Sequence, residues 1–391
     1  MTKPGSITRR SFSRMAGMAA LSVRTVWLSA ANRSRSSIES NGSGFAFLGA
    51  FGERQGIHVY AVSGDQWRFL QFAPSDAPVA MALHRNGRWL YVLNGVSEFG
   101  GLPCGSVEAF NFDAQSGLLT PLGHQALSLS ATLPSSIAVA PDGENLLVAV
   151  HGGGAYNLLP ILPDGRAGHV TSVIKETGCG SVPGHQDSAH PQSVAFDTTG
   201  KRCIATDLGA DRITTFLVNN GLTIQSRFDL PAGSGPSHLA LHPNGQLVYV
   251  ANALEDSLSG FRYDSETGTI TGHIVQIDGA GGQALAMHPT GRFLYTAGSG
   301  RVAAWRIDSS SGVLHRVQPG CIQMIQAGVV HEMAVDLSGR SLIVLADQET
   351  TSFEIDPDSG RLSSSFLLAS LRGADRIRSI ALIQSCFDRV Y

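Results

Sequence analysis

The stretch "GPSHLALHPNGQLVYVANALED", residues 235–256, decides the fold. It contains an alternating apolar run, an Asn-Gly turn, a second run rich in β-forming residues, and a polar break. Asn-Gly between two such runs is the strongest short-range signal of a β-hairpin. Nearly the same phrase returns as "GGQALAMHPTGRFLYTAGSG" at 281–300 and as "PVAMALHRNGRWLYVLN" at 78–94. The chain is therefore an array of related hairpins.

The spacing of the turn glycines gives the size of the repeat. Successive turn glycines are 45 to 57 residues apart, at Gly87, Gly143, Gly200, Gly245, Gly291 and Gly339. A second glycine follows each one, often in a D-x-x-x-G phrase, at Gly117, Gly165, Gly221, Gly268, Gly312 and Gly360. Two turns per repeat indicate a four-stranded antiparallel meander, and a period of this length predicts a β-propeller.

The two ends of the array complete one further blade. Six full repeats start near residues 77, 133, 190, 235, 281 and 329. Before them, 44–72 reads as three strands without an innermost one, and after them 376–383 reads as one strand without a blade. Joining them removes the exposed edges of an open array. We therefore predict an all-β, seven-bladed propeller over 44–385, closed by N- and C-terminal strands in one blade.

Any site is expected at the axis, on one face of the ring. The tight turns join the first strand of a blade to the second and the third to the fourth, so they share one face. The longer segments, 95–106 and 175–191, fall on the other face. Variable loops on a rigid scaffold are where sites are usually built. We call the axial opening on this second face the mouth.

Two rings of residues are predicted around the mouth. Eight residues before each turn glycine, at the start of the innermost strand, lie Val79, Ser135, Gln192, Ser237, Gln283 and His331. Where the second strand ends lie Asn94, His151, Asp207, Asn252, Gly298 and Asp347. Polar residues at strand ends also cap turns through local hydrogen bonds. Their recurrence at one register nevertheless favours a shared axial pocket.

The remaining histidines divide by position. His84, His242 and His288 fall beside the tight turns, away from the mouth, and are interpreted as structural. His185 and His190 flank the long segment before the fourth blade and are better candidates for a site. The phrase "HGGGAY" at 151–156 is interpreted as a tight connection between strands, because no helix follows it to receive a phosphate.

Composition excludes several classes of function. The net charge of -3 gives no electrostatic reason to expect nucleic acid or an anionic membrane as a partner. The five cysteines are scattered and never spaced as C-x-x-C, so we expect isolated buried thiols rather than zinc ligands or disulfides. No segment is long and apolar enough to predict a membrane span.

The N-terminus differs from the rest. "TRRSFSRM" at 8–15 is typical of a twin-arginine export signal; it precedes a short apolar run and a small-residue stretch, although Arg24 interrupts the run. We expect residues 1–40 to be a signal and linker outside the blades, and the protein to be periplasmic or secreted. A disordered basic tail on a cytoplasmic protein is the alternative.

The phrase at 235–252, together with "HPQSVAFDTTGKRCIATDLGADRI" at 190–213, resembles the β-propeller lactonase family, the cycloisomerase-2 type that includes 6-phosphogluconolactonase and carboxy-cis,cis-muconate cyclase. The resemblance covers essentially 44–385. It implies an enzyme that opens a lactone with water, or closes one, at the axial mouth. That chemistry needs a base to position water and a cation or donor for the oxyanion.

The chain departs from the family pattern at four places. The family typically has an arginine where this chain has Ser237 and a glutamate where it has Ala253. The second histidine of the family's H-x-H phrase is Gln192, and an arginine at the start of blade seven is His331. The usual cation and carboxylate are therefore missing from their places.

Two hypotheses follow. The first is a lactonase-like hydrolase acting on a sugar lactone as a monomer, without metal or organic cofactor. In it His190, His331, Asp207 and Asp347 would supply acid–base function, Arg54 would supply the cation, and the ligand would be contacted by Gln192, Ser237, Asn252, His151, His185 and Gln283. The second is a propeller that binds a small ligand or a protein without chemistry.

Overall fold

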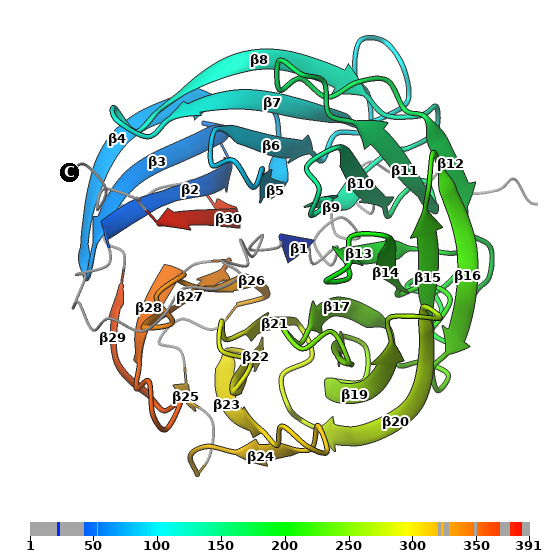
Figure 1. The fold of residues 1–391 in the computed structure, drawn as a ribbon, viewed down its shortest axis with the longest axis vertical. Helices are drawn as coiled ribbons and strands as arrows, with labels where there is room; N and C mark the ends of the chain where they lie inside the picture. The colour runs from blue at the N-terminus through cyan, green and yellow to red at the C-terminus, as the bar shows by residue number, and fades with distance from the viewer. Residues whose placement is uncertain are drawn as a thin grey trace, which may run out of the picture.

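The fold is a ring of seven antiparallel sheets, which confirms the predicted propeller (Figure 1). The computed structural model describes residues 22–23, 43–52, 54–319, 322–323, 328–347, 350–367 and 376–384. No helix in these described segments is long and apolar enough to cross a bilayer.

Each blade is a meander of four strands that runs outward from the axis. The innermost strands, from blade one to blade seven, are β30 (Arg376–Gln384), β5 (Pro78–Leu83), β9 (Pro134–Val139), β13 (Pro191–Phe196), β17 (Pro236–Leu241), β21 (Ala284–Met287) and β26 (Val330–Val335). The second strands are β2 (Ser43–Phe51), β6 (Trp89–Asn94), β10 (Asn145–Val150), β14 (Arg202–Asp207), β18 (Leu247–Asn252), β22 (Phe293–Gly298) and β27 (Ser341–Ala346).

The outer half of each blade follows the same order. The third strands are β3 (Gly56–Ser63), β7 (Ser106–Asp113), β11 (Ala155–Pro160), β15 (Arg212–Val218), β19 (Ser257–Asp264), β23 (Arg301–Ile307) and β28 (Thr350–Ile355). The outermost strands are β4 (Gln66–Pro74), β8 (Leu118–Ala126), β12 (Ser172–Lys175), β16 (Leu222–Asp229), β20 (Thr269–Asp278), β24 (Leu314–Arg316) and β29 (Leu362–Leu367). In blade six a short β25 (Ile322–Gln323) also pairs with β23.

Burial falls from the axis to the rim, and the sequence follows it. In blade four every residue of β13 is buried, whereas in β16, "LTIQSRFD", residues alternate between more and less exposed positions. An inner strand packs against a neighbouring blade on both faces and so reads as a continuous apolar run, while an outer strand has one face in water.

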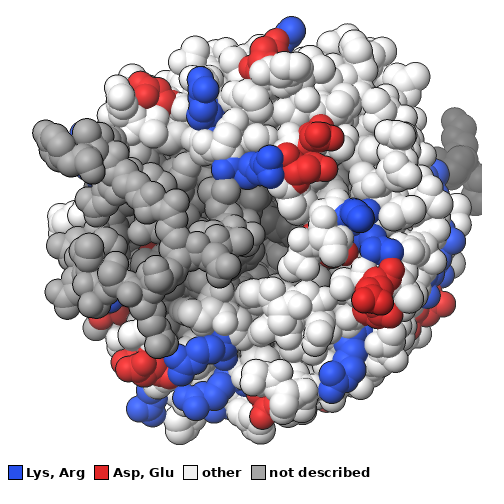
Figure 2. All heavy atoms as spheres, viewed as in Figure 1, with Lys and Arg blue, Asp and Glu red and all other residues white. Residues whose placement is uncertain are grey.

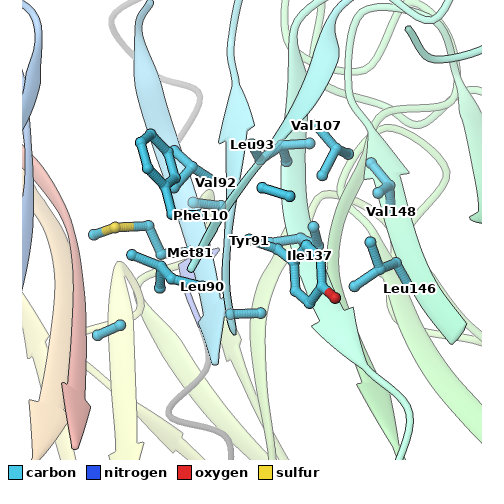
Figure 3. Close-up of a cluster of buried hydrophobic side chains, with 14 of the residues drawn as sticks. Met81, Leu90, Tyr91, Val92, Leu93, Val107, Phe110, Ile137, Leu146 and Val148 are labelled. Atoms are coloured by element: carbon cyan, nitrogen blue, oxygen red, sulfur yellow. The ribbon is translucent and has the colours of Figure 1, made fainter. Parts of the chain in front are cut away.

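The apolar core lies in the seams between blades. Figure 3 shows the seam between blades two and three, where Tyr91 on β6 lies close to Ile137 on β9 and Leu146 on β10. All three are fully buried. Full burial of such a side chain contributes roughly 1.5–3 kcal/mol, so the seams supply most of the stability of the ring.

The repeated phrase also carries polar ties between neighbouring blades. His84, His242 and His288 donate from Nε2 to the carbonyl oxygens of the turn glycines Gly143, Gly291 and Gly339 in the next blade, at 3.0, 2.9 and 3.0 Å. The hydroxyls of Tyr91, Tyr249 and Tyr295 donate to the carbonyls of Gly165, Gly312 and Gly360, at 3.0, 2.8 and 3.2 Å. The interpretation of these histidines as structural is confirmed.

These ties also explain why the turn residue is glycine. Gly143 has φ of +82°, a region that side chains with a Cβ rarely adopt. A Cβ on Gly143 would lie only 2.4 Å from Nε2 of His84, and one on Gly291 would lie 2.6 Å from Nε2 of His242. The turn therefore needs glycine for two reasons: its φ is positive, and a Cβ would collide with the histidine of the preceding blade.

Two regions differ from expectation. Cys104 and Cys203 are buried free thiols, but the thiol of Cys179 is exposed because it lies in the surface crossing from β12 to β13; Cys321 and Cys386 fall outside the described residues. Within the predicted leader, β1 (Ser22–Val23) pairs in parallel with β9 and lies at the centre of the ring (Figure 1), so this pair of residues does not lie outside the blades.

His238, on β17, is a histidine that the fold keeps neutral. Its ring is fully buried beside the backbone of His331, with Nδ1 3.2 Å from the Ser237 hydroxyl. Burial lowers its pKa to about 4, and the nearby His331 adds to that effect when charged. In the unfolded chain the same group titrates near its ordinary value of about 6.5.

Removal of one blade-to-blade tie should weaken the ring measurably. His242→Leu deletes the bond to Gly291 and leaves that carbonyl without its donor, so we expect unfolding in urea to require about 1–3 kcal/mol less free energy. His315→Leu, at an exposed position, is the matched control and should change stability by less than about 0.5 kcal/mol. Equal losses in both variants would contradict a specific role for the tie.

His238 should make the fold sensitive to acid. Because its folded pKa is depressed, its stabilising contribution is complete above about pH 6.5 and is lost as pH falls toward 4, a loss of roughly 3 kcal/mol. Urea unfolding at pH 7 and pH 4.5 measures this loss. His238→Gln should flatten the slope between these pH values, whereas His315→Gln should keep the wild-type slope; an unchanged slope in His238→Gln would show that this ring does not titrate on unfolding.

Candidate functional site at the axial mouth

A β-bulge opens the innermost strand of nearly every blade at the mouth. The ladder skips one residue there in six blades, at Val79, Ser135, Gln192, Ser237, His331 and Arg378. In blade six Gln283 is skipped in the same way, between bridges from Gly282 and Ala284 to Ala297. A bulge re-aims one side chain out of the regular ladder. The first predicted ring is therefore a ring of bulged residues.

The second predicted ring also lies where counting placed it. Asn94, Asp207, Asn252 and Gly298 are the last residues of their strands, and His151 and Asp347 directly follow theirs. Backbone strain gathers on the same face: of seven non-glycine residues with positive φ in the described chain, six lie in its loops, at Ala77, Ser130, Leu133, Asp211, Asp256 and Ser299. Such strain clusters at functional sites.

His331, Asp347 and Arg378 form a compact group between blades seven and one, which we call the charged cluster. Nε2 of His331 is 2.8 Å from Oδ1 of Asp347, and Nδ1 is 2.7 Å from Nη1 of Arg378. Nη2 of Arg378 is 3.2 Å from the same Oδ1. The His331 side chain is 2% exposed, that of Arg378 14% and that of Asp347 25%, so the carboxylate and guanidinium reach the surface while the ring does not.

The hydrogen bonds in the charged cluster fix where the proton of His331 lies. A guanidinium only donates, so Nδ1 of His331 must accept from Arg378. The ring proton is then on Nε2 and is donated to Asp347. Burial acts to raise the pKa of Asp347, but the hydrogen bond from His331, the charge that His331 carries when it is protonated, and the charge of Arg378 outweigh it and hold that pKa below its ordinary value.

Arg378 is the residue that sequence reasoning missed. The closing strand was predicted, but positions were counted from turn glycines, and β30 has none because its partner β2 comes from the other end of the chain. Aligning "IRSI" of β30, residues 377–380, with "VHEM" of β26, residues 330–333, places Arg378 at the register of His331. Arg54, the predicted cation, is exposed in the loop between β2 and β3.

A second group, the histidine cluster, lies between blades three and four and comprises His151, His190, Gln192 and Asp207. The two imidazole rings stack with centroids 4.4 Å apart. Nδ1 of His190 is 3.1 Å from the carbonyl oxygen of His151, and Nε2 of Gln192 is 2.6 Å from Nδ1 of His151. Oδ1 of Asp207 accepts from the backbone N–H of His190 at 2.7 Å.

Burial shifts both titrating groups behind the His190 ring. It lowers the pKa of His151 to about 3, helped by the charge of His190, so this ring is neutral. It raises the pKa of Asp207 to about 6 even though the N–H groups of His190 and Ala210 stabilise the carboxylate. Oδ2 of Asp207 is buried without a hydrogen-bond partner among the described residues. An acid with this pKa can exchange a proton near neutral pH.

Three other predicted site residues form hydrogen bonds with backbone or side-chain groups of the blades themselves. Ser237 lies 3.2 Å and 3.3 Å from the carbonyl oxygens of Ala251 and Gly282, and Gln283 accepts from the N–H of Val330 at 3.1 Å. The amide of Asn252 donates to the hydroxyls of Ser257 and Ser259, both at 2.9 Å. His185 is half-buried in the crossing from β12 to β13.

Outside the two clusters, the described residues hold no candidate metal site, and a groove lies at the rim of the ring. Among the described residues no three His, Cys, Asp or Glu side chains gather to hold a metal ion. A groove of about 590 Å³ lies at the rim between blades two and three, lined by Leu122, His124, Pro160 and Arg166 among others. On the described part of the face in Figure 2, acidic and basic side chains are interspersed.

Comparison with known proteins agrees with this architecture. The profile of a family described as "Lactonase, 7-bladed beta-propeller" matches residues 45–370. The 6-phosphogluconolactonase of Bacillus subtilis is 28% identical over 192 residues, 49% of this chain and 53% of that one. A 6-phosphogluconolactonase of Formosa agariphila is 26% identical over 227 residues, 55% and 63% of the two chains. The matches thus span about half to two thirds of these relatives.

A solved structure shows the same fold over almost its full length. The periplasmic gluconolactonase of Pseudomonas aeruginosa superposes with a TM-score of 0.77 at 23% identity, covering 88% of this chain and 99% of that one. Together with the family profile, this likeness confirms the resemblance read from the repeated phrases. The chain belongs to the lactonase family of seven-bladed β-propellers.

Proposed function

We propose that this protein is a hydrolase that opens a small lactone at the axial mouth. The charged cluster carries the proposal, because it gathers a cation and a carboxylate within 3.2 Å of each other although the family's usual positions hold Ser237 and Ala253. Arg378 supplies the cation from a bulge in the same ring of residues as Ser237.

Arg378 and His190 have complementary roles in the proposed reaction. Water attacks the lactone carbonyl carbon and its proton passes to a base, while negative charge develops on the carbonyl oxygen. Arg378 would stabilise that oxygen. His190 is the base, because donation from Nδ1 to the His151 carbonyl leaves Nε2 as an acceptor on a half-buried ring. The ring oxygen then leaves, takes the proton back, and a hydroxy acid is released.

The charges of the mouth favour an uncharged lactone over a phosphorylated one. Arg378 is already paired with Asp347, so with His331 neutral the charged cluster has no net charge. Phosphate recognition normally uses cations or several N–H donors to balance the charge of the ligand. We therefore propose an unphosphorylated sugar lactone as substrate, in contrast to the phosphorylated sugar named for the bacterial relatives.

A panel of lactones, followed by acid release at constant pH, tests the function. We expect hydrolysis above the spontaneous rate, with a higher kcat/KM for gluconolactone than for its 6-phosphate. Arg378→Gln should lower kcat/KM by roughly 10²-fold or more, because the developing oxyanion loses its cation. Arg54→Gln, the matched control in an exposed loop, should leave it unchanged.

The opposite pattern would count against these assignments. Equal activity of Arg378→Gln and the wild type would remove the charged cluster from the reaction. A preference for the 6-phosphate would overturn the substrate class but leave a lactonase in place.

A binding module without chemistry is the second candidate, and one observation favours it. Both ring nitrogens of His331 are engaged and the pKa of Asp347 is lowered, so the charged cluster itself is a poor proton acceptor. Binding of a hydroxy acid by calorimetry, with no hydrolysis of any lactone, would support this candidate.

We also propose that the protein is exported in a folded state. "TRRSFSRM" supports this, and one relative of the same fold is periplasmic. Arg9→Lys combined with Arg10→Lys should keep the protein in the cytoplasm, still folded, because twin-arginine recognition needs the pair. Cell fractionation measures this outcome, with Arg14→Lys as the control, and unchanged export of the double variant would reject the signal.

A further inference from the structure

We propose that His331 is a positioning residue which holds Arg378 in place only while its own ring is neutral. The site would then bind and stabilise its ligand through a latch that acid opens. The kinetic part of this inference rests on the proposed lactonase function, but the latch itself does not, because it is a property of three side chains in the unliganded protein.

Three contacts among the described side chains define the closed state of the latch. The His331 ring lies between Nη1 of Arg378, at 2.7 Å from Nδ1, and Oδ1 of Asp347, at 2.8 Å from Nε2. The direct contact of Arg378 with Asp347 closes the triangle at 3.2 Å. Within the charged cluster, the guanidinium is therefore held at two points, by one neutral acceptor and one carboxylate.

Protonation of His331 removes one of those two points. A proton on Nδ1 would face an N–H of Arg378 across 2.7 Å, with a positive charge on each side. Neither group can then accept, so the contact changes from a hydrogen bond to a repulsion. Arg378 keeps its contact to Asp347 but loses the second point that the charged cluster gave it. A cation held at fewer points is a poorer clamp for an oxyanion.

The described groups around His331 act on its charge in opposite directions. Burial and the charge of Arg378 oppose protonation, and Asp347 favours it. His238 is neutral at pH 7, because its pKa is lowered to about 4, so it adds no positive charge beside His331 there. Glu332, the next residue, is buried and accepts from the N–H of Ile380 at 2.9 Å. Among the residues that the structure describes, the titratable and charged groups that face the ring include Asp347, Arg378, His238 and Glu332.

The kinetic test replaces His331 by a side chain that bonds but does not titrate. Glutamine offers Oε1 as an acceptor for Arg378 and Nε2 as a donor for Asp347, so His331→Gln should remain active at pH 7 although less so than the wild type. Wild-type kcat/KM should fall about tenfold per pH unit once His331 protonates, and this part of the acid decline should be absent in His331→Gln. His331→Leu should be poorly active at every pH.

Two controls separate the latch from general effects. His315→Gln, at an exposed site, should keep the wild-type pH profile. A His331→Gln variant with the wild-type acid decline would overturn the latch while the lactonase function stands. Thermal unfolding of each variant shows whether any loss comes from the fold.

A spectroscopic test needs no substrate. In the full-length protein labelled with ¹⁵N at histidine and arginine, His331 should carry its proton on Nε2 at pH 7, and the side-chain signal of Arg378, assigned by its absence in Arg378→Lys, should move with the titration of His331. A proton on Nδ1 at pH 7, or an Arg378 signal that ignores that titration, would overturn the latch. If the signals move together and no lactone is hydrolysed, the latch stands and the proposed function falls.

Discussion

The antiparallel pairing of β30 with β2 is the contact on which the rest of the ring depends. It joins residues 376–384 to residues 44–51 and places the two ends of the array in one sheet. Without it, blade one would lose its innermost strand and the seams on either side of β30 would lose their packing. β30 also carries Arg378 at the mouth, so the same strand pairing closes the ring and completes the charged cluster.

The repeated phrase is explained by the needs of the seams rather than by the chemistry of the mouth. His242 and Tyr249 belong to the phrase quoted first, and each donates to a turn glycine of the following blade. Such donors recur where blades must meet in the same geometry. The bulged positions, in contrast, differ from blade to blade, from Val79 to Ser237 to Arg378.

The same distinction between the seams and the mouth explains which parts of the structure could be predicted from the sequence. Counting from turn glycines located both rings because strand length is constant near the axis. It could not reach Arg378, since closure pairs strands that share no turn. Nor could it show that Asn252 and Ser237 would bond to their own scaffold, because those contacts depend on carbonyl and hydroxyl groups of other strands. A polar residue at a given register position therefore predicts where its side chain lies, but not which group that side chain will hydrogen-bond.

The pseudo-symmetry of the ring allows the proposed site to draw its cation from a different blade. The ladder skips one residue at the same register in blades four, seven and one, at Gln192, His331 and Arg378. In the proposed function, the cation that the family resemblance implies at Ser237 would come instead from Arg378, which lies in a different blade. The proposed ligand would then lie in a rotated orientation, with the charged cluster on one side and the histidine cluster on the other. The scaffold fixes the distance of functional groups from the axis, and the choice of blade fixes the orientation of whatever binds between them.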